Sequence, residues 1–528
     1  MRNKKYCVIL SIIAVIESIL LISFPFFTSK LVDNAIDAID TNKYKEMYYA
    51  AFFVLGVTGL LVIFRIISNA LYYHFYVKEE KNMRSILFSS LIEKKYKDIS
   101  SYHQAEIDQL FTADIRHIIK KDLDTIPTFF RQASRLILAV VYLLILDWKF
   151  LIAVLILGIF GFVSAKIYSK VMKSRHKACL ESDGKASSFT IEAFEQIKLI
   201  ESYEAEGYSK KFYDDLNNRA AEAKKRRNRI LFIASSGLYG FSTLVYSLAL
   251  CYGAYQISHE YLTYGAMIAL VQLLSNIQNP LISFSPLLNE INLAKSCEER
   301  INNVLKLPNV SNSIDIKDFN KISFNDVSFS YSSDKEIISN LTFEINKGDI
   351  VLLKGPSGIG KTTLFMLMLG FISPNSGNIL VDSKYEISEC KSLFSYVPQE
   401  NILFSGTIRD NIYILTGRNA DDAISALKLA NVYDELLELD GLDTILKSRG
   451  SGLSIGQIQR ILIAIAILRD APILLLDEFS SALDKANEEI IINNLRKIGK
   501  TILYITHRDA VFESSKTILL EKSIDNVW

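Results

Sequence analysis

Six long apolar segments occupy the first 300 residues and limit the fold of this chain more than any other feature. They run over Cys7–Phe27, Met47–Val77, Ile126–Leu146, Phe150–Lys170, Ile230–Ile257 and Gly265–Ile291. A helix needs about 20 apolar residues to cross a bilayer, so each segment is long enough. Core helices of a soluble protein are the alternative, which the length of the second and fifth segments disfavours. We therefore predict an integral membrane protein with the lipid bilayer as a partner.

The connections between these segments alternate between short and long, and the long ones carry most of the basic residues. The two long connections cover residues 78–125 and 171–229, and the second contains the basic run Lys224–Arg227. Because basic connections stay on the cytoplasmic side, we expect both termini to be cytoplasmic. Both connections have helical patterns, and we expect them to turn near Asp98–Asp108 and Thr190–Lys198.

After residue 303 the pattern changes from membrane helices to a soluble α/β pattern. Residues 304–320 are polar and rich in asparagine, which is typical of a linker. From residue 321 to 528, short apolar runs alternate with helical patterns, as in a parallel sheet with crossover helices. We therefore predict a transmembrane domain at 1–303, a linker at 304–320 and a soluble domain at 321–528.

Charge and cysteine content exclude several classes of function. The formal net charge is +1, so the composition does not predict nucleic acid as a partner. The five cysteines are scattered along the chain without a CxxC pair. That spacing argues against a disulfide framework and against a metal cluster.

A glycine-rich phosphate-binding loop follows the short β-rich run Asp349–Lys354. It consists of Gly355, Pro356, Ser357, Gly358, Ile359, Gly360, Lys361 and Thr362, and Thr363 continues into an apolar helix. The glycines let backbone N–H groups cradle phosphate oxygens, Lys361 reaches the terminal phosphates, and the Thr362 hydroxyl binds Mg²⁺. The helix N-terminus adds partial positive charge. The loop predicts ATP and Mg²⁺ as cofactors.

Polar residues follow three further predicted strands, where parallel sheets place their ligands. Asp477 and Glu478 follow the buried run Ile473–Leu476. Asp477 is suited to hold Mg²⁺, and Glu478 is suited to polarise an attacking water. Gln399 and His507 follow two other short strands. Two solvated carboxylates at a strand end are common, but beside a phosphate-binding loop we interpret them as functional.

The ordered set of motifs resembles that of the ATP-binding cassette (ABC) transporters, specifically half-transporters of the exporter type. After the phosphate-binding loop come Val397–Gln399, Leu403–Ile412, Leu453–Gln457, Asp477–Glu478, Ser481–Asp484 and His507. The resemblance covers essentially the whole chain. It implies a six-helix all-α transmembrane domain fused to an α/β P-loop NTPase domain that hydrolyses ATP.

The resemblance also implies a head-to-tail dimer of cassettes with two ATP molecules between them. It gives catalytic roles to Glu478, His507 and Gln399, and metal binding to Thr362, Gln399 and Asp477. Tyr331 would stack on adenine, and the signature of the partner copy would complete each site. Ser454, Gly456, Gln457 and Asp484 are the further nucleotide-site residues that it implies. Ser454 and Gln457 also fit a capping box, which is compatible with that role.

Two residues depart from the family pattern. Ile455 stands where the signature has glycine, and Ser448 stands where a carboxylate is expected. Either the chain tolerates Ile455 in a symmetric homodimer, or it is one half of a heterodimer with unequal ATP sites. We favour the homodimer, because symmetric assembly is common.

The function implied is ATP-driven export of an amphipathic small molecule, peptide or lipid across a bacterial cell membrane. Import of metal chelates, and gating or sensing without net transport, are the alternatives. The face formed by Gln272, Asn276, Asn279 and Ser283 lines either the pathway or a helix contact. Glu17 and Arg65 lie within apolar segments, where we expect them either to pair or to bind substrate.

Overall fold

Long helices build the first of two units in the structure, which is a computed structural model. The unit comprises Met1–Ile92 and His103–Lys306, and the second unit comprises Glu93–Tyr102 and Leu307–Trp528. The structure describes residues 4–310, 314–331, 336–356, 358–400, 402–447, 452–506 and 516–520, and within the helices the side chains of 40, 153, 155–171, 173 and 238 are outside this description.

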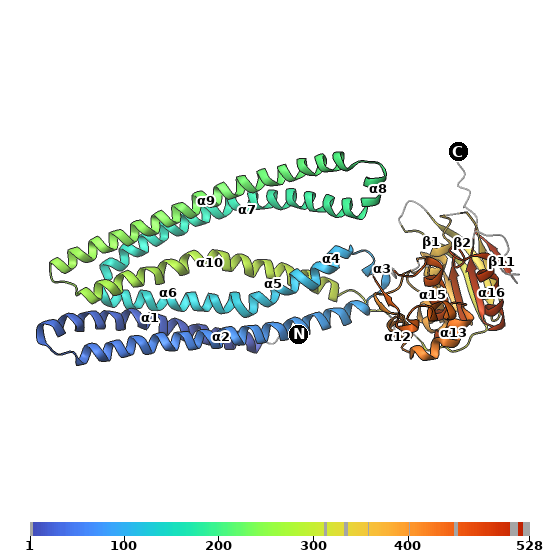
Figure 1. The fold of residues 1–528 in the computed structure, drawn as a ribbon, viewed down its shortest axis with the longest axis horizontal. Helices are drawn as coiled ribbons and strands as arrows, with labels where there is room; N and C mark the ends of the chain where they lie inside the picture. The colour runs from blue at the N-terminus through green and yellow to red at the C-terminus, as the bar shows by residue number, and fades with distance from the viewer. Residues whose placement is uncertain are drawn as a thin grey trace. The chain divides into compact units, whose positions relative to one another are not determined.

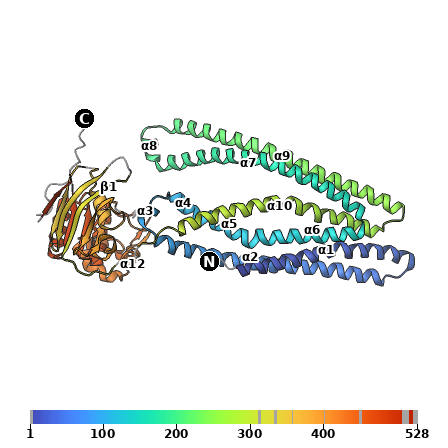
Figure 2. The same cartoon turned by 180° about the vertical axis from the view of Figure 1, so that it is seen from behind.

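The first unit contains six main helices, as predicted. They are α1 (Lys4–Thr41), α2 (Lys45–Ile92), α6 (Ile126–Leu146), α7 (Trp148–Glu195), α9 (Glu206–Ser258) and α10 (Tyr264–Leu305). The short helices are α3 (Tyr96–Ile99), α4 (Gln104–Gln109), α5 (Ile115–Lys120) and α8 (Ile197–Ser202). α1 packs against α2, α6 and α10, and α7 packs against α9 (Figure 1). Seen from behind, the α7–α9 pair diverges from α6 and α10 toward α8 (Figure 2).

Five helical stretches among the described residues are long and apolar enough to cross a membrane. They are Lys4–Ile39, Lys45–Ile92, Gln104–Leu146, Glu206–Ser258 and Tyr264–Leu305. The fourth predicted segment, Phe150–Lys170, lies within α7, but most of its side chains fall outside the described residues. The helical membrane domain predicted from the sequence is therefore confirmed.

The connection between the first two apolar segments, residues 28–46, is mostly helical. α1 continues to Thr41 before α2 begins at Lys45. The polar extension of α1 is held by Asp33, whose carboxylate accepts hydrogen bonds from Thr263 Oγ1 at 2.9 Å and from Gly265 N at 2.8 Å. Asp33 thus binds the start of α10, and this tertiary contact extends the helix beyond its apolar stretch.

A second aspartate, Asp147, fixes the turn between α6 and α7. Its Oδ1 accepts hydrogen bonds from the backbone N–H groups of Lys149 and Phe150, at 2.9 and 3.1 Å, and so caps α7. Its Oδ2 accepts a hydrogen bond of 2.6 Å from Tyr252 of α9. One short side chain therefore joins three helices.

The third predicted segment belongs to a longer helix that contains two π-helical stretches. These are η1 (Leu110–Asp114) and η2 (Lys121–Thr125), which flank α5. Asp114 accepts hydrogen bonds of 2.9 and 2.6 Å from Arg300 of α10. Lys121 of η2 forms an ion pair with Glu298 of α10. Charged contacts thus tie both π-helical stretches to the last long helix.

The second unit contains two larger sheets and a two-stranded one among its described residues, which confirms the predicted α/β class. The antiparallel sheet has the order β2 (Ile338–Asn346), β1 (Lys321–Phe329), β4 (Ser376–Val381), β5 (Tyr385–Glu386). The parallel sheet has the order β11 (Lys516–Leu519), β3 (Ile350–Lys354), β10 (Thr501–Ile505), β9 (Ile473–Asp477), β6 (Phe394–Val397). A short antiparallel pair joins β7 (Gly406–Thr407) to β8 (Ile445–Leu446).

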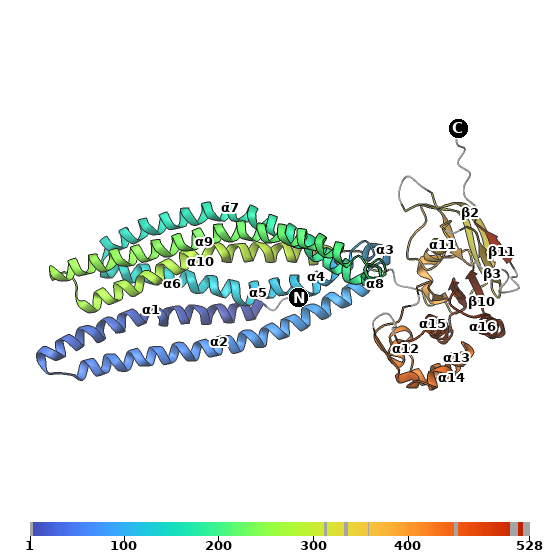
Figure 3. The same ribbon diagram turned by 45° about the horizontal axis from the view of Figure 1, so that its top comes forward.

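Helices divide this unit into two lobes with separate apolar cores. They are α11 (Lys361–Met368), α12 (Ile408–Thr416), α13 (Ile424–Leu429), α14 (Tyr433–Leu437), α15 (Ile455–Arg469) and α16 (Lys485–Lys497). Figure 3 shows α12, α13 and α14 at one end and α11 with the strands at the other. The first core joins the helical lobe to β9 and β10, and the second joins α11 to both sheets. The second unit also contains four short 3₁₀ turns, namely η3 (Ile387–Glu389), η4 (Lys391–Leu393), η5 (Ala420–Ala423) and η6 (Gly441–Asp443).

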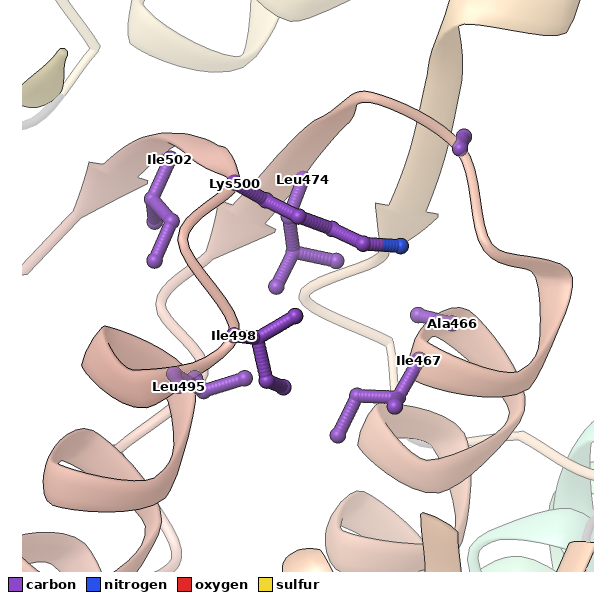
Figure 4. A pocket seen from close by; sticks show the side chains of 8 residues that line it. Ala466, Ile467, Leu474, Leu495, Ile498, Lys500 and Ile502 are labelled. Carbon is purple, nitrogen blue, oxygen red and sulfur yellow. The ribbon is translucent and has the colours of Figure 1, made fainter. Parts of the chain in front are cut away.

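A small apolar pocket lies within the first core, between α15, β9 and α16. Figure 4 shows Leu474, Leu495, Ile498 and Ile502 around one space, with Lys500 extending across it. The Lys500 ammonium forms an ion pair of 2.6 Å with Asp470. Because the other lining side chains are apolar, we assign this pocket to core packing.

Candidate functional site

The register of the parallel sheet brings the predicted strand-end residues to one edge. Ile505 of β10 pairs with both Leu353 of β3 and Asp477 of β9. Val397 of β6 pairs with Leu476, the residue before Asp477. The chain therefore leaves β3, β9 and β6 at the same edge of the sheet, where parallel α/β sheets bind ligands.

The phosphate-binding loop owes its shape to glycines with left-handed backbone conformations. Gly358 has φ 77° and Gly360, which precedes α11, has φ 108°. A Cβ at Gly360 would also lie 2.7 Å from Ile337 Cγ2. Glycine alone adopts such backbone conformations readily, so the loop can wrap closely around a ligand. Ser357, a predicted member of the loop, lies outside the described residues.

Lys361 is folded back into the loop that it ends. Its Nζ donates hydrogen bonds to the carbonyl oxygens of Gly355, at 2.8 Å, and Pro356, at 3.1 Å. The side chain is buried, so the loop surrounds its ammonium group. A bound phosphate would offer stronger acceptors than these neutral carbonyls, because charge-assisted hydrogen bonds are the stronger ones.

Asp477 and Thr362 form a pair of oxygen ligands suited to a small hard cation. The Thr362 hydroxyl lies close enough to Asp477 to favour the ionised form of that carboxyl, and Asp477 Oδ2 accepts a long hydrogen bond of 3.5 Å from Tyr396. Asp477 is fully buried, and its Oδ1 has no hydrogen-bond partner among the described residues. Burial raises the pKa of the Asp477 carboxyl. An unsatisfied carboxylate oxygen beside a hydroxyl fits the oxygen chemistry of Mg²⁺.

Glu478 and Gln399 meet at the same edge. Gln399 Nε2 donates a hydrogen bond of 2.8 Å to Glu478 Oε2. Glu478 has a left-handed backbone with φ 51°, which is uncommon outside glycine. Its backbone N–H donates to Ile505 O at 3.1 Å, and its carbonyl accepts from Gln459 Nε2 at 3.3 Å. The two predicted residues are thus together, whereas His507 lies outside the described residues.

Tyr331 lies beside the helix that follows the phosphate-binding loop. Its hydroxyl is 3.4 Å from Thr363 Oγ1, and its ring packs edge-on against Phe329 at 4.9 Å. The side chain is 59% exposed. An exposed ring next to the loop suits stacking against an aromatic base.

The signature segment caps α15. Ser454 Oγ accepts a hydrogen bond from Gln457 N at 3.2 Å, and Gln457 Oε1 accepts one from Ser454 N at 2.9 Å. This is the reciprocal capping box expected from the sequence. Ile455, at the first turn of α15, is 62% exposed. The other departure from the family pattern, Ser448, lies outside the described residues.

Asp484 begins α16 rather than contacting the phosphate-binding loop in its own chain. Its Oδ1 accepts a hydrogen bond of 2.8 Å from Asn487 N. Hydrogen bonds from Asn487 lower the pKa of this exposed carboxyl. Asp484 is thus an N-cap in its own chain, and its place at a nucleotide site stays a prediction.

Sequence reasoning did not identify the network centred on Arg460. This buried guanidinium donates to both carboxylate oxygens of Glu435, each at 2.6 Å, and to Asn431 O at 2.6 Å. Gln457 Nε2 donates to the same carboxylate at 3.1 Å. These bonds lower the pKa of Glu435. A basic residue inside the apolar run of α15 was the signal that could have revealed it.

Two family models match the chain. The ABC transporter transmembrane region matches residues 7–281, which is more than half of the chain, and the ABC transporter model matches residues 338–481. The chain belongs to the ABC transporter family. As an ABC transporter it is an integral membrane protein that uses ATP and couples ATP hydrolysis to transport.

Relatives of this ABC transporter cover nearly its whole length. An export ATP-binding/permease protein of Rickettsia felis is 31% identical, over 97% of this chain and 91% of that protein. An ATP-dependent lipid A-core flippase of Saccharophagus degradans is 29% identical, over 83% of this chain and 76% of that protein. A bacterial Atm1-family ABC exporter with ATP bound has a similar fold, with a TM-score of 0.82 at 21% identity, over 96% of this chain and 92% of that one.

Proposed function

We propose that two copies of the cassette close around ATP and drive export of an amphipathic small molecule, peptide or lipid. This proposal rests on where the chain places its phosphate-binding loop and its signature segment, Ser454–Gln457. The phosphate-binding loop, Asp477, Glu478 and Gln399 meet at one sheet edge. Among the described residues, no hydrogen bond joins Ser454–Gln457 to that loop. The signature segment is therefore available to a second copy, whose ATP it would contact through the N-terminus of α15.

Within each site, the chain's own residues would act in sequence on the bound nucleotide. Lys361 exchanges its bonds to Gly355 and Pro356 for phosphate oxygens. Thr362, Asp477 and Gln399 would hold Mg²⁺, which neutralises phosphate charge when it is bound. Glu478 accepts a proton from the attacking water, and Gln399 orients the Glu478 carboxylate through the observed hydrogen bond. His507 is proposed to contact the terminal phosphate.

Two segments support a mechanical link between ATP and the membrane helices. Within the second unit, Lys94 donates to Leu307 O and Asn309 Oδ1, each at 2.7 Å, and the ring of Tyr96 packs against Phe371 at 5.0 Å. The segment around α3 is therefore anchored among cassette residues. The apolar side chains of Leu199 and Tyr203, near α8, are exposed. We propose that α8 docks on the partner's cassette and that cassette closure switches inward-facing to outward-facing states.

The proposed location is a bacterial cell membrane, with both termini and the ATPase unit in the cytoplasm. Homology to a lipid A-core flippase and to export permeases supports outward transport. Gln272 accepts a hydrogen bond of 3.1 Å from Thr28 of α1, and Asn276 is buried. For these two residues the alternative of a helix contact is therefore favoured over a role in the pathway.

The test is ATP-driven flux in liposomes that hold the full chain with its cassettes outward. Fluorescent amphiphiles and lipids that stimulate its ATPase are then followed into the lumen. We expect accumulation by the wild type and none by E478Q, because a general base contributes about 10²–10⁴-fold. E478Q should still bind ATP, and E489Q, a change at an exposed glutamate of α16, should match the wild type. Flux out of the lumen would favour an importer, and ATPase without flux would favour a sensor.

A further inference from the structure

Three arginines and one glutamate come together among the apolar helices of the first unit. Glu17 lies on α1, Arg65 on α2, and Arg131 and Arg135 lie one turn apart on α6. α1 packs against both α2 and α6 (Figure 1). Arg131 Nε is 3.2 Å from Glu17 Oε2. Arg65 and Arg135 are both close enough to Arg131 to repel it.

A structural role accounts for only one of these positive charges. Glu17 pairs with Arg131, and Ser18 Oγ donates to Arg131 O at 2.9 Å, so this contact joins α1 to α6. Asp124, two turns before Arg131 on the same continuous helix, also attracts it. Even with both acids counted, the arginines exceed them.

Several polar atoms in this region are buried without a hydrogen-bond partner, although the Arg65 side chain itself is exposed on α2. Glu17 Oε1, Gln132 Oε1 and Arg135 Nε lack one among the described residues, and Arg131 Nε has only its ion pair with Glu17. Buried donors without acceptors are costly, and more so when they are charged. Arg135 is about 16 Å along α6 from Leu146, at a rise of about 1.5 Å per residue. This places it within the depth of a bilayer core of about 30 Å, where ionisable residues commonly mark ligand pathways.

We propose that Arg65, Arg131 and Arg135 form a site for the anionic group, a phosphate or carboxylate, of an amphipathic molecule. Its oxygens accept hydrogen bonds from the three guanidinium groups, including the unpartnered Arg135 Nε, and its apolar chain lies along α1, α2 and α6. The anionic group belongs either to the transported substrate or to a lipid headgroup. The assignment of the anionic group to a transported substrate rests on the proposed export function.

The test compares three probes that share one alkyl chain, namely dodecyl phosphate, dodecyl maltoside and dodecyltrimethylammonium. Their affinities are measured for the full chain in phosphatidylcholine nanodiscs. We expect the phosphate to bind at least about tenfold more tightly than the others, and R135Q or R65Q to remove that preference, as charge-assisted hydrogen bonds warrant. R135K should retain part of it. R84Q is the matched control on α2, because Arg84 pairs with Glu80 at 2.7 Å on an exposed face.

Equal affinity for the three probes, or an unchanged preference in R135Q and R65Q, overturns the site. Native mass spectrometry in nanodiscs with added phosphatidylglycerol separates the two sources. If the wild type retains that lipid, R135Q loses it and dodecyl phosphate shows no ATP-driven flux, the anionic group bound at the site is that of a lipid headgroup. Arginine-dependent flux identifies the substrate. If dodecyl phosphate binds as expected but nothing is exported, the anion site is supported and the export function is contradicted. If a substrate is exported but no probe shows an anion preference, the export function is supported and the anion site is contradicted.

Discussion

At the scale of single residues, position 456 favours glycine because a neighbouring backbone atom lies close to it, and not because its own backbone conformation excludes other residues. It lies in the first turn of α15, and a Cβ there would be 2.9 Å from the backbone oxygen of Ala482. That oxygen belongs to the segment after Glu478, so Gly456 fixes how closely the signature helix approaches it. The sequence indicated Gly456 by resemblance, and the structure supplies the reason.

We expect G456A to lower the thermal stability of the full chain. Alanine favours a helix by about 1 kcal/mol over glycine, but overpacking against a backbone atom costs about 1–3 kcal/mol, so the clash should prevail. G207A is the control, because a Cβ at Gly207 meets nothing within 4 Å. Thermal unfolding in detergent measures both variants. An equal or higher Tm for G456A would show that the contact can relax.

A second residue-scale prediction concerns the buried Asp477. Burial raises its pKa above the unfolded value, so the folded state holds its proton more tightly. Stability is therefore lost as pH rises from the unfolded pKa through the folded one. We expect D477N, in the absence of nucleotide, to have a higher Tm than the wild type at neutral pH and a flatter dependence of Tm on pH. It should also lose the stabilisation that Mg²⁺ adds with ATP.

The comparison for that prediction is D440N, at an exposed aspartate before η6 whose side chain does not cap that turn. The same pH series of melting curves is recorded without nucleotide and with ATP, each with and without Mg²⁺. A lower Tm for D477N at neutral pH would mean that the carboxylate is stabilised in the folded state. Retained Mg²⁺-dependent stabilisation would remove Asp477 from the metal site.

At the scale of elements, Arg460 joins the signature helix to the helical lobe. The guanidinium on α15 holds Glu435 of α14 and the carbonyl of Asn431, and it also donates to Asn487 of α16 at 3.2 Å. The sequence of α15 is apolar over most of its length. It could not show that three elements would each present an acceptor to one buried arginine.

We expect R460L to destabilise the full chain by about 1.5–3 kcal/mol, the range for hydrogen bonds to charged groups. The cost is limited because Glu435 is partly exposed and can regain water. ATPase activity should fall as well, since the signature helix loses its support. R469L, at an exposed position on the same helix, is the control for thermal unfolding and for turnover. Equal losses in both variants would assign the effect to helix propensity.

At the scale of the whole molecule, the open question is which second half completes the ATP site. We expect the full chain, purified without any other cassette protein, to dimerise with ATP and to hydrolyse it. If Ile455 is tolerated because it keeps its backbone N–H, I455G should change turnover by less than tenfold, or about 1.4 kcal/mol. Crosslinking and ATPase assays measure both. Negligible turnover that a second half-transporter restores would establish a heterodimer.

Much of the candidate site followed from local patterns. Strand ends before Gly355, Gln399 and Asp477 predicted a common edge, and the register of the parallel sheet confirmed it. The hydrogen bond between Gln399 and Glu478 could not be predicted, because it joins two strands distant in sequence. The domain limits at 303 and 321 stay predictions, although the structure groups Glu93–Tyr102 with the second unit.

The sequence by itself determined the membrane helices, the nucleotide loop and the family, because periodicity, segment length and motif spacing are local properties. Only the tertiary structure determined which ion pairs and hydrogen bonds the charged side chains form. Glu17 pairs with Arg131 and not with Arg65, and Asp33 extends α1 by binding the start of α10. Such choices depend on which helices touch. The free energy of a buried charge is set by its neighbours in space, which residue spacing along a chain does not specify.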